Sequence, residues 1–306
     1  MTFTEKVTIE PVAPFDFALS AKILSYGDIR VRSFREGILS LTLHVDGRLV
    51  WVRLSSNGQV DKPLLTLELH ADTALSSSQI QKVQETIEHI FSLNLPLRDF
   101  YNQVQSDPIM KQITQKLYGL KFPTTITVFE ALVYAIVEQQ ISIKVARSIE
   151  ERLALKFGDQ LHLDEGTFFA FPTPQALVKA GAEEIRQAGL SQRKADYIYG
   201  AAQLIVDGKL DIERISMKNP EEIIAELDAI RGIGVWTAEL TMLRGMHKFD
   251  ALPADDLGIR RVISRYYCGK KPIKAEEARK IAEPWGNWKG LAAFYLMAAE
   301  VNDITL

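Results

Sequence analysis

The sequence predicts an α+β fold, with an antiparallel sheet domain at residues 1–95 followed by an all-helical body at residues 96–306. Alternating apolar residues between positions 38 and 69 indicate paired strands. From position 97 onward the apolar residues recur at helical spacing. A Gly-Ile-Gly turn at residues 227–238 separates two of these helices, and the body is expected to form two helical subdomains with a cleft between them.

The N-terminal region contains a strong hairpin signal. Ile38–Val45 alternates between apolar and polar residues, Asp46–Gly47 forms a two-residue turn, and Leu49–Ser55 returns. Leu64–Leu69 alternates again, and Ser77–Phe91 has a helical apolar stripe. No chemical motif occurs in this region, so a structural role is expected for it.

Helix signals continue through the second region. Asp107 before Pro108 is a typical helix start, with an N-cap carboxylate followed by proline in the first turn. The main expected helices cover Asp107–Leu117, Val128–Gln139, Ser142–Phe157, Arg193–Val206, Pro220–Ile230, Val235–Arg244, Asp256–Tyr267 and Trp288–Val301.

Composition narrows the class of protein. A chain of 306 residues with 47% hydrophobic and 25% charged residues has the balance of a soluble globular protein. No apolar run reaches the ~18 residues of a membrane span, and no apolar stretch of a signal peptide follows the N-terminus. The single cysteine, Cys268, excludes an internal disulfide and a four-cysteine iron–sulfur cluster. A cytoplasmic location is expected.

The charge distribution says more than the net charge. A net charge of −3 argues against nucleic-acid binding for the whole chain. Between Leu257 and Lys280, however, basic residues outnumber Glu276 and Glu277, which fits either a solvated helix face or a DNA-facing one. The basic residues are Arg260, Arg261, Arg265, Lys270, Lys271, Lys274, Arg279 and Lys280.

The segment Leu227–Asp256 carries the main functional signal. Gly232 and Gly234 separate two amphipathic helices, and glycines allow positive φ and the close approach of another backbone. The second helix begins there, so its unpaired N–H groups suit a phosphate, with Gly232, Gly234 and Thr237 as candidates. A plain helix–turn–helix elbow is the alternative. About twenty residues after the glycines comes Asp255-Asp256.

The string Ile230–Ala238, IRGIGVWTA, resembles the hairpin of the helix-hairpin-helix (HhH-GPD) DNA glycosylases. Three further strings support the resemblance: AIVEQQIS at Ala135–Ser142, GLSQRKAD at Gly189–Asp196 and LPADDLGIRR at Leu252–Arg261. Within this superfamily the sequence is most similar to the AlkA-type 3-methyladenine DNA glycosylase II. The resemblance is strongest from Pro123 to Glu300 and extends weakly to the N-terminal domain.

The resemblance implies hydrolysis of the N-glycosidic bond of an alkylated purine such as 3-methyladenine. It assigns the essential carboxylate to Asp256, which would stabilise an oxocarbenium-like sugar and orient water. Asp255 is the rival residue. A helix N-cap is the alternative role for both aspartates. Asp256 is favoured because the hairpin precedes it at the family spacing.

The position of Trp236 predicts the reaction subtype. Lyase-competent relatives have a lysine at this position, so tryptophan implies a monofunctional glycosylase without lyase activity. Trp236 can also stack on a cationic base. By their positions in the resemblance, Leu240, Leu257 and Met297 would complete the base pocket.

The resemblance also places residues at the DNA. Gln139 and Gln140 are both expected to contact DNA. Gln140 occupies the position of the family's intercalating leucine, and a polar wedge can still fill the gap left by a flipped nucleotide. Arg260 follows the catalytic aspartate and is expected to face DNA. By motif position, the backbone carbonyls of Asp228, Ile230 and Ile233 would hold a structural Na⁺ or K⁺.

These inferences define the expected function and its alternatives. A monomeric enzyme acting on double-stranded DNA with alkylated bases is favoured, with no required cofactor and no membrane association. A same-fold glycosylase for uracil, hypoxanthine or an oxidised purine is the first alternative. A damaged-DNA-binding module without catalysis is the second, although the intact Asp256 argues against it.

Overall fold

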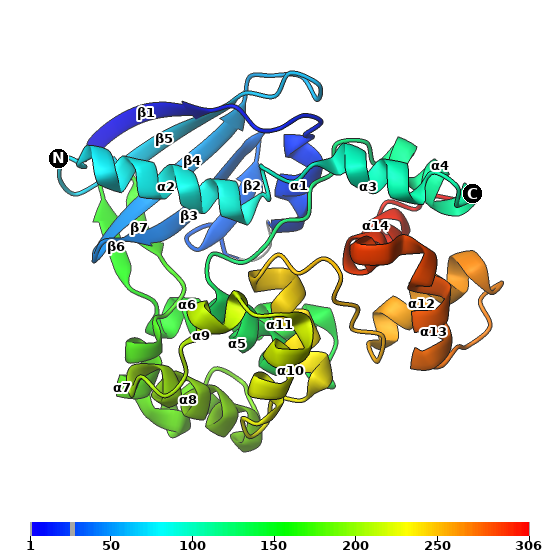
Figure 1. Cartoon of the computed structure of the whole chain (residues 1–306). Coiled ribbons are helices and arrows are strands. Elements are labelled where there is room, and N and C mark those ends of the chain that lie inside the picture. The colour runs from blue at the N-terminus through cyan, green and yellow to red at the C-terminus, as the bar shows by residue number, and fades with distance from the viewer. Residues whose placement is uncertain (1, 25–27, 306) are drawn as a thin grey trace.

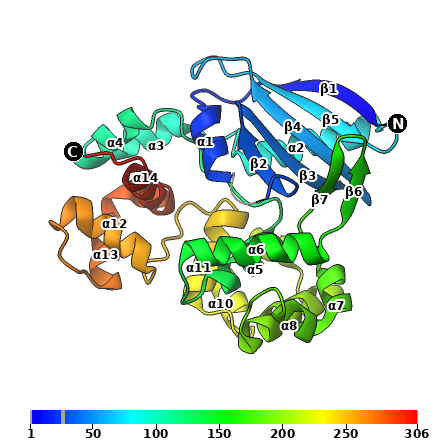
Figure 2. The same ribbon diagram turned by 180° about the vertical axis from the view of Figure 1, so that it is seen from behind.

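The structure is a computed structural model that describes residues 2–24 and 28–305. Figures 1 and 2 show a sheet domain with one group of helices below it and a second group to its side. Each of these three units has its own principal apolar core, which confirms the predicted α+β class. Within the described residues, no helix combines the length and apolarity that a membrane crossing needs.

The N-terminal sheet has the strand order β1-β5-β4-β3-β2, with every neighbouring pair antiparallel. The turn predicted at Asp46–Gly47 joins β3 to β4, since Val45 pairs with Arg48. Apolar residues of one sheet face are buried together with α1 and α2 in a single core. The elements are β1 (Phe3–Ile9), α1 (Phe17–Leu24), β2 (Arg32–Arg35), β3 (Ile38–Val45), β4 (Arg48–Ser56), β5 (Leu65–Ala71) and α2 (Ser77–Ile90).

The first group of helices forms around the most apolar helix of the body. In this helix, α5, every residue from Val128 to Val137 is buried. It packs against α11 in the core of the lower group in Figure 1. The group contains α5 (Val128–Glu138), α6 (Ile143–Phe157), α7 (Pro174–Arg186), α8 (Gln192–Val206), α9 (Ile212–Ser216), α10 (Pro220–Asp228) and α11 (Val235–Gly245).

The second group of helices joins segments that are far apart in the sequence. Figure 1 shows α3 and α4 beside α14, and the chain then crosses to the first group before it returns. Phe100, Trp285 and Tyr295 are fully buried where these segments meet. The group contains α3 (Leu97–Val104), α4 (Pro108–Lys116), α12 (Leu257–Tyr267), α13 (Ala275–Ala282), the 3-10 helix η1 (Glu283–Trp288) and α14 (Lys289–Val301).

The prediction of an all-helical body was wrong at one place. A two-stranded hairpin, β6 (Gln160–Leu163) and β7 (Gly166–Phe169), interrupts the helices between α6 and α7. It packs on the N-terminal sheet, where Phe168 stacks on Trp51 with ring centroids 4.0 Å apart. Its strands contain four residues each, too short for a clear alternation in the sequence. The partner surface that stabilises them lies more than a hundred residues earlier in the chain.

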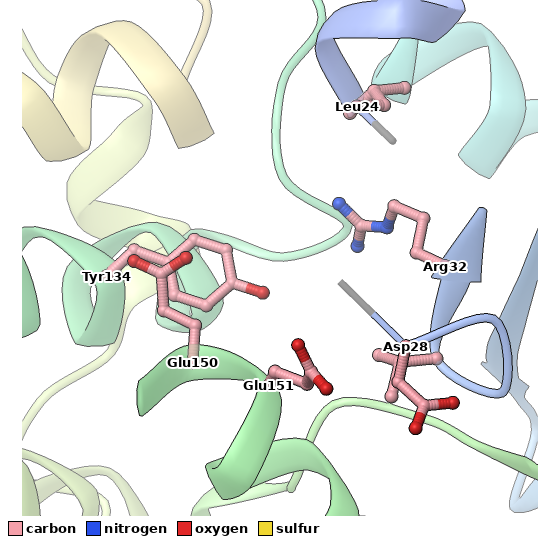
Figure 3. A pocket seen from close by; sticks show the side chains of 7 residues that line it. Leu24, Asp28, Arg32, Tyr134, Glu150 and Glu151 are labelled. Atoms are coloured by element: carbon pink, nitrogen blue, oxygen red, sulfur yellow. The ribbon is translucent and has the colours of Figure 1, made fainter. Parts of the chain in front are cut away.

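The joint between the sheet domain and the body contains a buried ion pair and a small cavity. Arg32 of β2 forms a buried ion pair with Glu130 of α5, with a 3.0 Å distance. Figure 3 shows the small cavity beside it, of about 20 Å³, lined by Leu24, Asp28, Val31, Arg32, Tyr134, Glu150 and Glu151. That volume accommodates about one water molecule, and none of the residues predicted for the site lies there.

Candidate active site at the hairpin and the α12 N-terminus

The hairpin between α10 and α11 is a tight turn that needs glycine at one position. The turn is closed by a hydrogen bond from the Ile233 amide to the Ile230 carbonyl, and the Ile233 side chain is buried. Gly232 has φ +92°, and a Cβ at this position would lie 2.2 Å from the ring of Tyr197. Any side chain would therefore clash with α8 as well as strain the backbone.

The start of α11 has the features expected of an anion site. Gly234 is its N-cap, is exposed, and offers no side chain to the first-turn amides. Nothing lies within 4 Å of the position that a Gly234 Cβ would occupy, so the space in front of the helix is open. Unpaired N–H groups and the helix dipole together favour a phosphate there. The open space lies at Gly234, whereas Gly232 packs against Tyr197 and Thr237 is buried, so phosphate binding by these three residues stays a prediction.

Gln139 connects the end of α5 to this hairpin. Its side-chain amide donates to the Gly232 carbonyl and to the Thr237 hydroxyl, both at 3.0 Å. The next residue, Gln140, is exposed and has φ +57°, an uncommon conformation for a residue with a side chain. Strained backbone of this kind concentrates at functional sites. The Gln139 amide nitrogen, expected at the DNA, is thus engaged within the protein, and Gln140 is the exposed residue of the two, whose role as a wedge stays a prediction.

Asp256 lies at the N-terminus of α12 and faces the hairpin. Its Oδ1 accepts hydrogen bonds from the amides of Gly258 (2.7 Å) and Ile259 (3.0 Å), which makes it the helix N-cap. Its Oδ2 accepts a hydrogen bond from the indole Nε1 of Trp236 at 3.2 Å. The side chain is half-buried. Capping and a role in chemistry are therefore compatible, because the two functions use different oxygens.

Asp255, the rival residue, points elsewhere. Its side chain is 62% exposed, and its Oδ2 lies 4.0 Å from a guanidinium nitrogen of Arg279. Two aspartates adjacent in sequence thus have different partners, and the indole of the hairpin helix reaches Asp256. This geometry favours Asp256 as the reactive carboxylate.

The residues expected to form the base pocket gather only in part. Leu257 is 75% exposed beside Asp256, and the Met297 methyl lies 3.9 Å from the position of a Cβ on Gly258. These two side chains and Trp236 therefore border the first turn of α12. Leu240, one helical turn after Trp236, is 5% exposed and belongs to the protein interior. It can contribute to the floor of a pocket but not to an open wall.

The basic run after Asp256 is not uniformly available to DNA. Arg261 and Arg265 both pair with Glu300 of α14, and Arg261 holds the pKa of that carboxyl below its usual range. Arg279 pairs with Glu239 of α11. Arg260 donates a long hydrogen bond (3.4 Å) to the neutral Asp255 carbonyl, and among the described residues no carboxylate lies within ion-pair distance of its guanidinium. Arg260 thus keeps the positive charge that its predicted DNA contact needs.

The monovalent-cation site stays a prediction. The Ile230 carbonyl already accepts the turn hydrogen bond and retains a second lone pair. Asp228 and Ile233 flank it on either side of the turn. Among the residues that the structure describes, no group of three or more His, Cys, Asp or Glu is arranged to hold a metal ion. Any ion here would depend on backbone carbonyls.

Sequence reasoning missed residues that support the site from a distance. Lys194 of α8 donates to the carbonyls of Val137 (2.7 Å) and Gln139 (2.5 Å), and burial lowers its pKa. It therefore caps the C-terminal end of α5 just before the wedge residue. The GLSQRKAD string contained this lysine, but spacing alone gave no indication of its partners. The Glu239–Arg279 pair was missed in the same way.

Comparison with known proteins supports the resemblance that the sequence strings suggested. The family HhH-GPD superfamily base excision DNA repair protein matches residues 133–287, which include the hairpin, Trp236 and Asp256. The DNA-3-methyladenine glycosylase of Bacillus subtilis is 28% identical over 237 residues, covering 77% of this chain and 78% of that protein. DNA-3-methyladenine glycosylase 2 of Escherichia coli is 29% identical, covering 60% and 61%.

The fold has close counterparts among solved structures. The 3-methyladenine DNA glycosylase from Archaeoglobus fulgidus superimposes with a TM-score of 0.86 and 28% identity, covering 98% of this chain and 100% of that one. The match therefore includes the N-terminal sheet domain as well as the helical body. Taken with the family match over half of the sequence, it leads to one conclusion. The chain belongs to the HhH-GPD superfamily of base excision DNA repair proteins.

Proposed function

We propose that the protein is a monofunctional DNA glycosylase of the AlkA type, which releases alkylated purines such as 3-methyladenine from double-stranded DNA. The observation that carries this proposal is the 3.2 Å hydrogen bond from Trp236 to Asp256. It holds a half-buried carboxylate beside a hairpin suited to phosphate. The names of the relatives in Bacillus subtilis, Escherichia coli and Archaeoglobus fulgidus support the alkylated substrate.

In the proposed reaction, the hairpin amides hold a phosphate while Gln140 fills the space of the flipped nucleotide. The extruded base enters beside Trp236, Leu257 and Met297. A purine alkylated at a ring nitrogen carries a positive charge, which an indole face attracts by about 0.5–2 kcal/mol. Cleavage of the C1′–N bond moves the bond electrons to this cationic base, so it leaves neutral without an added proton.

Asp256 would act on the sugar that remains. As the base leaves, positive charge develops at C1′, and a preorganised carboxylate stabilises it electrostatically. A water molecule then attacks C1′ and transfers its proton to the carboxylate or to solvent, which leaves an abasic site. The two cap bonds from the Gly258 and Ile259 amides keep the Asp256 carboxylate in place without reorganisation.

The first test replaces this carboxylate. Asp256→Asn keeps the size of the side chain and one oxygen for the cap, so the protein should fold and bind DNA. Loss of a charge partner in the transition state should lower base release by about 10³-fold or more. Single-turnover release of bases from methylated duplex DNA, separated by chromatography, measures this rate. Asp255→Asn is the matched control, and equal losses in both variants would reject the assignment to Asp256.

A second test addresses the monofunctional mechanism. A Schiff base requires an amine, and Trp236 at the hairpin has none. Borohydride reduction should therefore give no covalent complex between the protein and DNA that contains an abasic site. A lyase-competent glycosylase in the same assay should give such a complex. A covalent adduct with this protein would overturn the monofunctional assignment while leaving the glycosylase activity itself standing.

The choice of base is tested by a panel of duplexes. The residues proposed to border the base are Trp236, whose indole Nε1 is already bonded to Asp256, and Leu257 and Met297, whose side chains contain no strong hydrogen-bonding group. Such a border suits selection by charge and fit more than by hydrogen-bond pattern. Release of 3-methyladenine should therefore exceed release of uracil, hypoxanthine or 8-oxoguanine. The reverse order would establish the alternative of a same-fold glycosylase for another damaged base.

A further inference from the structure

An ion pair between a buried glutamate and a partly exposed arginine connects the hairpin helix to α13, beside the loop that carries Asp256. Glu239 lies on α11, three residues after Trp236, and its side chain is only 6% exposed. Both of its oxygens accept from the guanidinium of Arg279 on α13, at 2.9 and 3.3 Å. Burial raises the pKa of Glu239, and the Arg279 charge opposes that effect.

The same guanidinium also binds the loop before α12. Arg279 Nη1 donates to the Leu252 carbonyl at 3.0 Å, and Nη2 lies 4.0 Å from the Asp255 carboxylate. Within this loop the Ala254 amide bonds to the Leu252 carbonyl and the Asp256 amide to that of Pro253. A fork that bonds a carboxylate and a carbonyl together is a geometry that arginine provides and lysine does not.

These contacts close a ring around the proposed active site. Trp236 of α11 is bonded to Asp256, at one end of the loop. Leu252, at the other end, is bonded to Arg279, which is bonded in turn to Glu239 of α11. A cavity of about 230 Å³ adjoins the pair, lined by Pro220, Ile224, Glu239, Met242, Asp250, Ala251, Leu252, Arg279, Glu283 and Lys289. Packing alone therefore leaves the guanidinium room to move, and Glu239 restrains it.

We propose that Arg279, held by Glu239, is a positioning residue that fixes the Leu252–Asp256 loop and thereby holds the Asp256 carboxylate against Trp236. Arg279 is not a catalytic residue in this proposal, because it acts only through the loop. The kinetic part of the proposal rests on the proposed glycosylase function. The structural part, the rigidity of the loop, does not.

The test must separate positioning from general stability, because removing Arg279 alone leaves the buried Glu239 carboxylate without its charge partner. The double variant Glu239→Met/Arg279→Met removes both charges and replaces them with apolar side chains of similar length, so the fold should be retained. The control is Arg32→Met/Glu130→Met, which removes a more deeply buried pair, with side chains 9% and 1% exposed, at the domain joint away from the Leu252–Asp256 loop. Arg279→Lys keeps the charge but loses the fork.

Two readouts are needed. Hydrogen exchange, followed by mass spectrometry, should show the amides of residues 252–259 exchanging at least about 10-fold faster in the Glu239/Arg279 double variant and unchanged in the control. Single-turnover base release should fall by about 30-fold or more, since small displacements of a reacting group cost up to ~100-fold, while the affinity for abasic DNA stays within about threefold. The Arg279→Lys variant should release bases at a rate between those of the wild-type protein and the Glu239/Arg279 double variant.

Each outcome decides the proposal. Unchanged exchange in the double variant would overturn it, whatever the rate does. Faster exchange with an unchanged rate would show that the restraint does not position the carboxylate. If the wild-type protein released no alkylated base, the proposed function would fail, and the exchange experiment would still decide whether Arg279 restrains the loop.

Discussion

Gly258→Ala offers a strict test of how closely the structure must hold Asp256. Gly258 is the second residue of α12, and a Cβ at this position would lie 2.9 Å from Asp256 Oδ1 and 3.9 Å from the Met297 methyl. The second distance is an ordinary contact, whereas the first is about 0.5 Å too short for carbon and oxygen. The carboxylate would have to move away from its cap bonds, now 2.7 and 3.0 Å long.

The expected effect on stability is small because two terms oppose each other. Weakening an N-cap costs up to about 1 kcal/mol, and replacing glycine by alanine in a helix contributes about 0.5–1 kcal/mol in the other direction. The rate should respond more strongly, since a 1 Å displacement of a reacting group can cost about 10²-fold. A displacement of about half that size predicts a loss of roughly 10-fold in base release, with folding almost unchanged.

The assay pairs thermal unfolding with single-turnover base release on methylated duplex DNA. Gly200→Ala is the matched control, because Gly200 lies within α8 and nothing is within 4 Å of its added methyl group. The free energy of unfolding of that variant should rise by about 0.5–1 kcal/mol, and its rate of base release should not change. A Gly258→Ala protein that released bases at the wild-type rate would refute the claim that the position of the Asp256 carboxylate limits the reaction.

Two further predictions concern stability. Gly232→Ala should lower the melting temperature by several degrees, because the new methyl group would overlap the Tyr197 ring. Gly234→Ala meets open space and should lower it less, by the small cost of replacing a glycine N-cap with alanine; equal shifts in thermal denaturation would contradict this. Burial and His89 lower the pKa of His247 from 6.5 to about 4, and burial lowers that of His89. Both imidazoles are therefore neutral in the fold, and stability should be lost as the pH falls from 6.5 towards 4, by up to about 3 kcal/mol for His247. Urea titrations should show that the free energy of unfolding falls with pH across this range, and His247→Asn should make that fall smaller. The same pH dependence in the variant would count against the assignment to His247.

Local signals explain what the sequence revealed about the fold. The Asp46–Gly47 turn and the alternating residues around it specify a hairpin through backbone geometry and side-chain periodicity alone, and β3 and β4 pair at that turn. Asp107 followed by Pro108 starts α4, where the Asp107 side chain caps two amides. Such signals need no knowledge of distant residues.

Contacts between distant segments explain what the sequence did not reveal. The β6–β7 hairpin is stabilised by Trp51, which is far away in the chain, so its short strands carried no sufficient signal of their own. The partners of Lys194 are carbonyl groups, and a carbonyl is present at every residue, so no pattern marks them. The bidentate pair of Glu239 and Arg279 likewise depends on how α11 and α13 pack.

Asp256 shows why two interpretations of one residue need not compete. From the sequence, an N-cap and a catalytic carboxylate were alternatives, since either role accounts for an aspartate before a helix. In the structure the cap engages Oδ1 alone, and the Trp236 indole orients Oδ2. A flexible aspartate would have to be immobilised for each reaction, whereas a capping aspartate is immobilised when the protein folds. Helix capping therefore supplies part of the preorganisation that the proposed chemistry requires, which is why one methyl group at Gly258 should affect the rate more than the stability.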